Sequence, residues 1–168
     1  IQLSQYYGAK DFENLRKSLA HSYRLTAFIA AGVLILSQSF ASLVLTGLHT
    51  PSNIIGMSLL YLRIIFCGIP ATAAYNMFAS ALRAMGNSKT PLTSMIIASV
   101  LNVSLDILFV AGFGWGVAGA AIATVIAQSF SAVYCFLILR RIDIVHLTRA
   151  DFMPASGMNA RLMKLGIP

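Results

Sequence analysis

Four long apolar runs dominate the chain and limit what it can fold into. Each run is close to the roughly 20 residues that an α-helix needs to cross the hydrocarbon core of a bilayer. The lipid interior offers no water to an open backbone, so each run must be helical there. The sequence therefore predicts an all-α, polytopic membrane helix bundle, with helices at about residues 22–48, 54–84, 91–113 and 117–140.

The composition agrees with a membrane protein rather than a soluble domain. Of the 168 residues, 58% are hydrophobic and 10% are charged, and the mean hydropathy is +0.79. A soluble domain has about 25% charged residues. A net charge of +7 also occurs in proteins that bind nucleic acid, but here the basic residues lie at the ends of the predicted helices, not on an aromatic-studded surface. We therefore expect contact with a lipid bilayer and no nucleic acid partner.

The basic residues also predict how the chain is oriented in the membrane. All twelve Lys and Arg residues except Arg63 fall in residues 1–24, 83–91 and 140–168. By the positive-inside rule these three stretches are cytoplasmic, and the chain is a multi-pass protein of the plasma membrane. Arg63 lies inside the second apolar run, where two placements stay open. Its side chain either snorkels to the outer interface or faces a wet cavity.

The third predicted helix carries a carboxylate well inside its apolar run. Asp106 shares one helical face with Ser99 and Asn102. An ionisable group at this depth costs about 2.5–3.5 kcal/mol on insertion scales, so it should face protein or water rather than lipid. We expect Asp106 to take up and release a proton or to bind a cation. The alternative is a structural aspartate that only hydrogen-bonds a neighbouring helix.

Two of the other predicted helices carry polar stripes of their own. The second has a stripe made of Tyr61, Gly68, Thr72 and Tyr75, with Asn76 beside it. The fourth has a stripe made of Thr124, Gln128 and Ser131. Taken singly, such residues more often hold helices together than bind a ligand. Because three helices offer them, the sequence predicts one shared polar interior.

The sequence contains no recognisable enzyme motif. His21, His49 and His146 lie far apart in flanks or loops, so no metal-ligand spacing is present. No glycine-rich phosphate loop precedes a lysine, and no nucleophile can be paired with a base. Cys67 and Cys135 both lie inside apolar runs, which is ordinary core usage. We therefore expect neither a cofactor nor an enzyme activity.

Several stretches resemble multidrug and toxic compound extrusion (MATE) transporters in their order and spacing. They are SQYYGAKD (4–11), YLRIIFCGIPATAAYNMFASALRAMGNSKTPL (61–92), LNVSLDILFVAGFGWGVAGAAIATVIAQ (101–128) and LMKLGIP (162–168). The resemblance is closest to the subgroup related to DNA-damage-inducible efflux proteins. It implies that residues 1–168 are part of the six-helix N-terminal lobe, from the end of helix 2 to the start of helix 7. A cytoplasmic connection would then occupy about 141–162, and the C-terminal lobe would be missing.

The resemblance also implies a mechanism and a set of site residues. It implies export of small-molecule drugs or toxins, cationic and amphipathic, by antiport with H⁺ or Na⁺. The family's cation network would fall on Asp106, Asn102, Tyr61 and Thr124, with Na⁺ bound at Asp106 and Asn102 as one form of it. A weaker assignment places Gln128, Asn76, Tyr75 and Arg63 in the substrate cavity. The remaining carboxylate of the network lies on helix 1 in the family and is absent from this sequence.

Two other functions stay open on the sequence. A flippase for lipid-linked oligosaccharides has similar helices, but its cavity needs basic residues for a pyrophosphate, and only Arg63 is available here. A membrane-embedded enzyme or a non-transport membrane subunit is the second. A catalytic cluster near an interface would indicate an enzyme, and the sequence offers none.

Overall fold

The computed structural model of the chain describes residues 2–142. Every regular element in this range is a helix: α1 (Gln2–Gly8), α2 (Phe12–Gly47), α3 (Ile55–Cys67), α4 (Ile69–Ala84), α5 (Lys89–Asp106), the π-helix η1 (Ile107–Gly112) and α6 (Gly116–Arg140). Four spans are long and apolar enough to cross a membrane, namely α2, α3 with α4, α5 with η1, and α6. The predicted all-α membrane bundle is confirmed, and the chain is an integral membrane protein.

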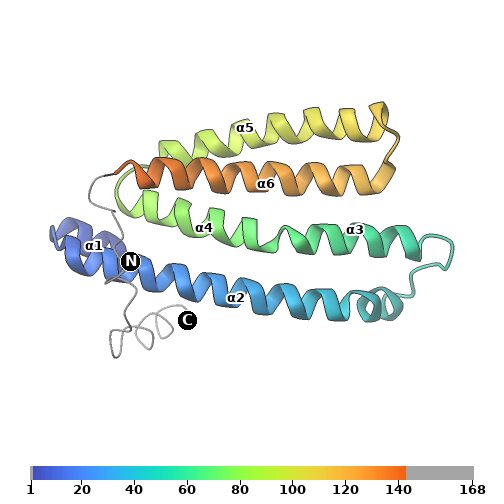
Figure 1. Cartoon of the computed structure of the whole chain (residues 1–168), viewed down its shortest axis with the longest axis horizontal. Coiled ribbons are helices and arrows are strands. Elements are labelled where there is room, and N and C mark those ends of the chain that lie inside the picture. Colours follow the sequence, from blue (N-terminus) through green and yellow to red (C-terminus); the bar gives the residue numbers. More distant parts are fainter. Residues whose placement is uncertain (1, 143–168) are drawn as a thin grey trace.

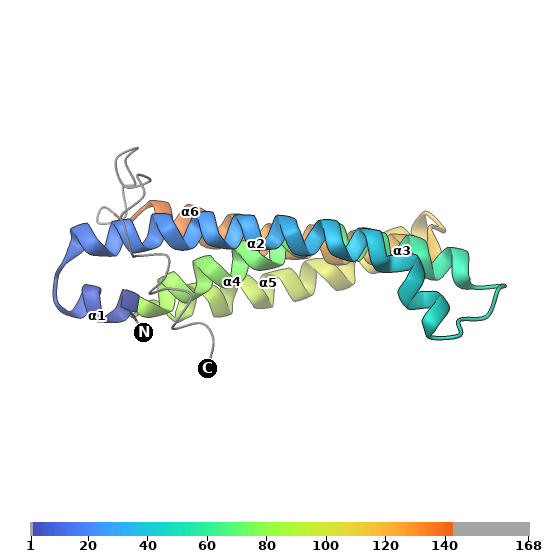
Figure 2. The same ribbon diagram turned by 90° about the horizontal axis from the view of Figure 1, so that it is seen from below.

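The four spans lie side by side in one layer. α5 packs against α6, α6 packs against both α3 and α4, and these two pack against α2. Figures 1 and 2 show the spans running nearly parallel to one long axis. Within the described part of the chain α2 and α5 do not touch, so they form the two edges of the layer.

The connections gather the basic residues at one end of the molecule. α1, the turn between α4 and α5, and the last turn of α6 meet there, and we name this the basic end (Figure 1). Apart from Arg63, every Lys and Arg in residues 2–142 lies in the half of the molecule nearest this end. The connections after α2 and after η1 lie at the opposite end. The cytoplasmic placement of the basic end stays a prediction, and most of the predicted connection at 141–162 falls outside the described residues.

The helices are packed unevenly along their length. Near the basic end, α2, α4 and α6 share a buried core made of Leu15, Leu19, Phe78, Ala81, Leu82, Met85, Cys135 and Leu139. By contrast, no residue of α3 or η1 is buried. In the half away from the basic end, small residues of α2 and α6 are buried instead, namely Ala41, Gly119, Ala121 and Ala123.

α2 begins at Phe12, earlier than the start near residue 22 that the apolar run predicted. Asp11 caps it, because its side chain accepts hydrogen bonds from the backbone N–H of Asn14 at 3.2 Å and from Asn14 Nδ2 at 2.7 Å. These two hydrogen bonds hold the pKa of Asp11 below its ordinary value. Leu15 and Leu19, one turn apart, are buried in the core. The polar start of α2 is therefore held by a cap and by packing.

The second span is two helices, where the sequence predicted one helix over 54–84. α3 ends at Cys67 and α4 begins at Ile69, with Pro70 in the first turn of α4. The proline ring removes a backbone N–H that a continuous helix would use. A Cβ at Gly68 would lie 3.0 Å from Val125 Cγ2 and 3.0 Å from the Ile65 carbonyl oxygen. Gly68 therefore lets α6 approach the point where the span breaks.

The turn between α4 and α5 is short and specified by its residues. Gly86 has a φ of 82°, and the N–H of Asn87 donates to the Leu82 carbonyl at 2.9 Å, which is the Schellman pattern. Asn87 Oδ1 then accepts from the N–H of Thr90 at 3.1 Å in the first turn of α5. Because the turn is short, α4 and α5 lie antiparallel, and residues of both helices meet at one cavity.

Candidate functional site

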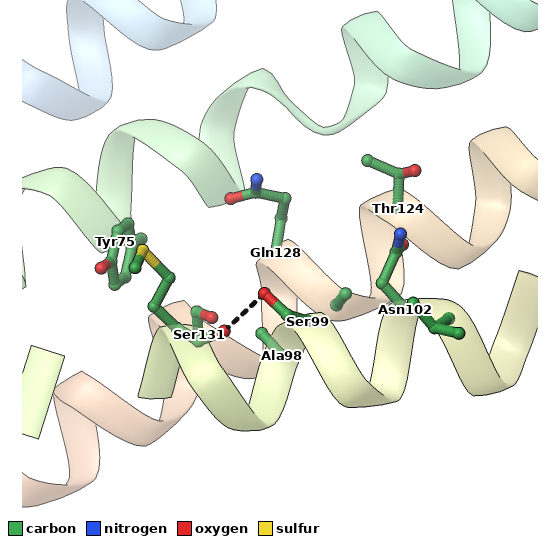
Figure 3. Close-up of a pocket in the computed structure, with 10 residues that line it drawn as sticks. Tyr75, Ala98, Ser99, Asn102, Thr124, Gln128 and Ser131 are labelled. Carbon is green, nitrogen blue, oxygen red and sulfur yellow. Dashed lines mark hydrogen bonds between the residues drawn. The ribbon is translucent and has the colours of Figure 1, made fainter. Parts of the chain in front are cut away.

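A polar cavity of about 350 Å³ lies between α4, α5 and α6. It is lined by Tyr75, Met95, Ala98, Ser99, Asn102, Val103, Thr124, Ala127, Gln128 and Ser131. Figure 3 shows Tyr75 from α4, Asn102 from α5, and Thr124 and Gln128 from α6 around it. All four were predicted site residues, and the structure brings them to one place.

Asn102 and Asp106 form a hydrogen-bonded pair on α5. Asn102 Nδ2 donates to Asp106 Oδ2 at 3.2 Å, as suits residues one helical turn apart. The Oδ1 atoms of both residues are buried, and neither has a hydrogen-bond partner within the described chain. Buried polar atoms are nearly always partnered, and leaving one without a partner costs about 1–3 kcal/mol. Two unpartnered acceptor oxygens on one hydrogen-bonded pair fit a proton or a hard cation, which prefers oxygen ligands.

The helix changes its geometry immediately after Asp106. η1 begins at Ile107, and the N–H of Phe113 donates to the Leu108 carbonyl at 2.9 Å, five residues back. π-helical turns are rare and often occur at functional sites. The wider turn rotates every residue after Asp106 relative to a continuous α-helix. The residues beyond the carboxylate therefore sit at different angles from those that the helical period predicted.

The hydroxyl groups of the cavity leave their oxygen lone pairs available. Thr124 Oγ1 donates to the Ala120 carbonyl of its own helix at 3.0 Å, and Ser99 Oγ donates to the Met95 carbonyl at 3.0 Å. A hydroxyl that donates in this way can still accept through its oxygen. Thr124 is thus able to contribute an oxygen to a cation or to accept from a ligand in the cavity.

A polar network joins α4, α5 and α6 at the side of the cavity nearest the basic end. Tyr75 Oη donates to the Pro91 carbonyl at 3.4 Å, and Ser94 Oγ donates to the same carbonyl at 2.8 Å. Ser131 Oγ donates to the Ser94 carbonyl at 3.4 Å, and Ser94 Oγ lies 3.3 Å from Cys135 Sγ. Such interhelical bonds hold helices together in a membrane, and here they fix one wall of the cavity.

Four of the predicted site residues do not line this cavity. Asp106 is outside the lining and reaches it through its hydrogen bond with Asn102. Tyr61 is 38% exposed on α3 and lines no part of it. Arg63 is exposed on the same helix and also lies outside the cavity. Asn76 is exposed and lines a separate depression beside α1, α2 and α4. The α3–α4 break explains the position of Tyr61, because the residues before Gly68 no longer follow the axis of α4.

Gln38 on α2 was not among the predicted site residues, yet it connects two spans. Its Nε2 atom donates to the Arg63 carbonyl oxygen at 2.9 Å and to Cys67 Sγ at 3.3 Å. Both acceptors belong to the last five residues of α3. The signal that would have found it is a carboxamide inside an otherwise apolar membrane run.

The described residues do not form a cluster of metal ligands at the site. Within residues 2–142, no three or more His, Cys, Asp or Glu residues gather closely enough to hold a metal ion together. Asp106, hydrogen-bonded to Asn102, is the acid of the site. This donor set fits a proton or Na⁺ rather than a bound transition metal.

Sequence comparison finds relatives that are named multidrug resistance and multidrug export proteins. The MatE family model matches residues 1–108. The probable multidrug resistance protein YpnP of Bacillus subtilis (strain 168) is 33% identical over 166 residues, which cover 99% of this chain and 37% of that protein. The multidrug export protein MepA of Staphylococcus aureus (strain NCTC 8325 / PS 47) is 24% identical over 169 residues, with the same coverage of each. The chain thus spans little more than one third of the length of these relatives.

Solved structures share the fold. A multidrug resistance MATE family transporter of the MOP superfamily in an inward-facing conformation gives a TM-score of 0.90 at 23% identity, covering 99% of this chain and 38% of that one. A MATE protein in a bent conformation gives a TM-score of 0.91 at the same identity and coverage. These likenesses establish the fold, and the family model, which matches more than half of the chain, establishes the family. The chain belongs to the MatE family of multidrug and toxic compound extrusion transporters.

Proposed function

We propose that the protein containing this chain is a secondary active transporter of the plasma membrane. It exports cationic, amphipathic compounds by antiport with H⁺ or Na⁺. Relatives named as multidrug resistance and multidrug export proteins support this proposal. Because the chain spans little more than one third of those relatives, the proposal concerns the whole protein, with the C-terminal lobe supplying the rest of the path.

The observation that carries the proposal is the pair of buried oxygens without partners. Asn102 Oδ1 and Asp106 Oδ1 are both acceptors, and nothing in the described chain donates to them. A proton on the carboxylate, or Na⁺ between the two oxygens, removes the cost of burying them. Thr124 lines the same cavity as Asn102 and offers a further oxygen. Tyr61 joins this site in the proposal, as the family resemblance implies.

The cavity also offers suitable chemistry for an amphipathic cation. Its volume of about 350 Å³ falls within the range of small-molecule sites. Tyr75 presents an aromatic ring, to which cations are attracted. Gln128 supplies an amide, while Met95 and Val103 supply apolar surface. These residues form the N-lobe part of the proposed drug site.

Antiport requires that the ion and the drug favour opposite states of the transporter. Asn102 belongs both to the ion pair with Asp106 and to the wall of the cavity. Ion binding at Asp106 therefore changes the charge and the hydrogen bonding at the drug site directly. In the proposed cycle, binding of H⁺ or Na⁺ releases the drug outward, and release of the ion inward restores drug binding.

The proposal is tested by comparing two variants of α5 in the complete protein. Asp106→Asn removes the ionisable group and is expected to reduce ion-dependent ethidium efflux from cells at least tenfold. Ser104→Ala is the matched control, because Ser104 is exposed and donates only to the Val100 carbonyl of its own helix. It is expected to transport normally. Intact efflux with unchanged ion dependence in Asp106→Asn would contradict the proposal.

The flippase alternative is disfavoured by the position of Arg63. It was the basic residue that the sequence offered for a pyrophosphate, and it lies outside the cavity. No basic side chain of the described residues lines the cavity, so a polyanionic cargo has no partner there.

A further inference from the structure

Tyr61 lies on α3, outside the cavity, so the placement of α3 determines where its side chain lies. It precedes Gly68 by seven residues, so the two lie on the same face of the span. Gly68 faces Val125 of α6, and this indicates that Tyr61 faces the side of the layer where α6 lies. Its hydroxyl makes no hydrogen bond to the described residues, and it is 38% exposed. The position of the Tyr61 hydroxyl therefore depends on the tilt of α3.

The break at Gly68 allows α3 to tilt while α4 stays in place. α4 is anchored by Phe78, Ala79, Ala81 and Leu82, which are all buried. α3 contains no buried residue. Helices bend at prolines and glycines, where the backbone ladder is interrupted. The structure thus joins the anchored α4 to α3, which packs against α2 and α6, through a single residue.

Gln38 restrains α3 just before its junction with α4. It comes from α2, and its Nε2 atom binds the Arg63 carbonyl oxygen and Cys67 Sγ. Both acceptors precede Gly68, so the restraint acts on α3 and not on α4. A carboxamide in a membrane helix is costly unless it is bonded, and these are the bonds that it makes in the described part of the chain.

We propose that Gln38 is a positioning residue for the ion site. Its bonds set the tilt of α3 about Gly68 and thereby fix how closely Tyr61 approaches Asn102 and Asp106. The inference rests on the proposed function, because the position of Tyr61 matters only if the ion binds at this site. It goes beyond that function in assigning a role to a residue that touches neither the ion nor the drug.

The test replaces Gln38 with methionine in the complete protein, reconstituted in lipid vesicles. Ethidium transport is driven by a sodium gradient at fixed pH and, separately, by a pH gradient without sodium. Gln38→Met keeps the side-chain length but removes the N–H donor. The half-saturating concentration of the coupling cation is expected to rise about three- to tenfold, as suits the loss of one or two hydrogen bonds. The KM for ethidium is expected to stay within about twofold, because Gln38 lies outside the cavity.

Two controls separate positioning from a general structural effect. Ser39→Ala is the matched control, because Ser39 Oγ donates only to the Ile35 carbonyl of α2. It should leave both constants unchanged. A double-mutant cycle with Tyr61→Phe asks whether Gln38 acts through Tyr61. If it does, Gln38→Met adds little to the effect of Tyr61→Phe.

Several outcomes would overturn the inference. They are an unchanged half-saturating cation concentration in Gln38→Met, an equal change in the KM for ethidium, or a full additive effect in the Tyr61→Phe background. If Gln38→Met does not fold, Gln38→Asn replaces it. Its amide is one methylene shorter and falls short of the Arg63 carbonyl, so the same shift is expected.

Asp106→Asn in the same assay distinguishes the two proposals. If Asp106→Asn keeps ion-driven transport, the proposed function fails, and this inference fails with it. If Asp106→Asn loses transport while Gln38→Met behaves like the wild type, only the positioning role of Gln38 is wrong.

Discussion

At the scale of single residues, Gly68 is one of two described glycines, with Gly119, where an added methyl group would meet atoms at 3.0 Å. A methyl group at Gly68 would meet Val125 Cγ2 and the Ile65 carbonyl oxygen at 3.0 Å. Gly68→Ala is expected to lower stability by about 1–3 kcal/mol, the usual cost of overpacking. Val125→Ala in the same protein should recover part of the loss, because it removes the side-chain contact and leaves the backbone one. Thermal unfolding in detergent measures both effects.

Gly32 supplies the control for this prediction. It lies inside α2, and a Cβ there would meet nothing within 4 Å. Gly32→Ala is expected to be neutral or to stabilise by up to about 1 kcal/mol, because alanine favours a helix more than glycine does. Equal stability losses for Gly32→Ala and Gly68→Ala would show that the close contact with α6 is not the cause.

The relative positions of two residues were predictable from the sequence where both lie on the same helix. Asn102 and Asp106 are four residues apart on one helix, so the helical period was enough to predict that they meet. Tyr61 was predicted from the family resemblance, and its placement outside the cavity depends on the break at Gly68. Gln38 escaped notice because its partners are a backbone carbonyl and a thiol on another span. No sequence pattern marks a backbone acceptor as the partner of a distant side chain.

At the scale of elements, the start of α2 depends on an ionised cap. Hydrogen bonds from Asn14 lower the pKa of Asp11. A carboxyl whose pKa is lowered on folding stabilises the fold above its unfolded pKa, and this contribution is lost as the pH falls through the folded pKa. Asp11→Asn keeps a good capping residue but does not titrate. The wild type should therefore exceed Asp11→Asn in thermal stability at neutral pH, and the difference should vanish on acidification below the ordinary aspartate range.

High salt provides a check on this prediction. The Asp11 side chain is partly exposed, and charge interactions near the surface are screened by salt. The hydrogen bonds from Asn14 are shorter-ranged, so the stability difference between the wild type and Asp11→Asn should survive at high salt.

A stability difference that is constant from neutral to acidic pH would mean that the ionised cap does not stabilise α2.

Hydropathy was sufficient to predict the four spans but not their exact construction. Apolar length alone decides whether a segment can cross a membrane, and each predicted run coincides with most of one span. The start of α2 was missed because residues 12–24 mix polar and apolar side chains, and the Asp11 cap and packing against α1 and α4 hold them in the helix. The break at Gly68 was missed because glycine and proline are both tolerated within membrane helices. Whether they break a span depends on the neighbour, here Val125 of α6.

At the scale of the whole molecule, the distribution of charge predicts a single orientation. Ser88 lies in the exposed turn at the basic end, and Ser52 lies in the exposed connection at the opposite end. With Cys67 replaced by alanine, and with buried Cys135 kept, single cysteines at the two positions report their sides. Ser88→Cys should react with a membrane-impermeant thiol reagent only in inverted vesicles, and Ser52→Cys only in intact cells. The reverse pattern would place the basic end outside.

Because α4 is anchored by buried residues, a tilt of α3 about Gly68 moves each residue of α3 in proportion to its distance from Gly68. With a rise of 1.5 Å per residue, Tyr61 lies roughly 10 Å from Gly68, so a tilt of about 5° displaces it by roughly 1 Å. That displacement is enough to make or break a hydrogen bond. The first residue of α3 lies about twice as far from Gly68 and moves about twice as much. In the proposed ion site, such a rotation would bring the Tyr61 hydroxyl in or out without disturbing the buried core of α2, α4 and α6.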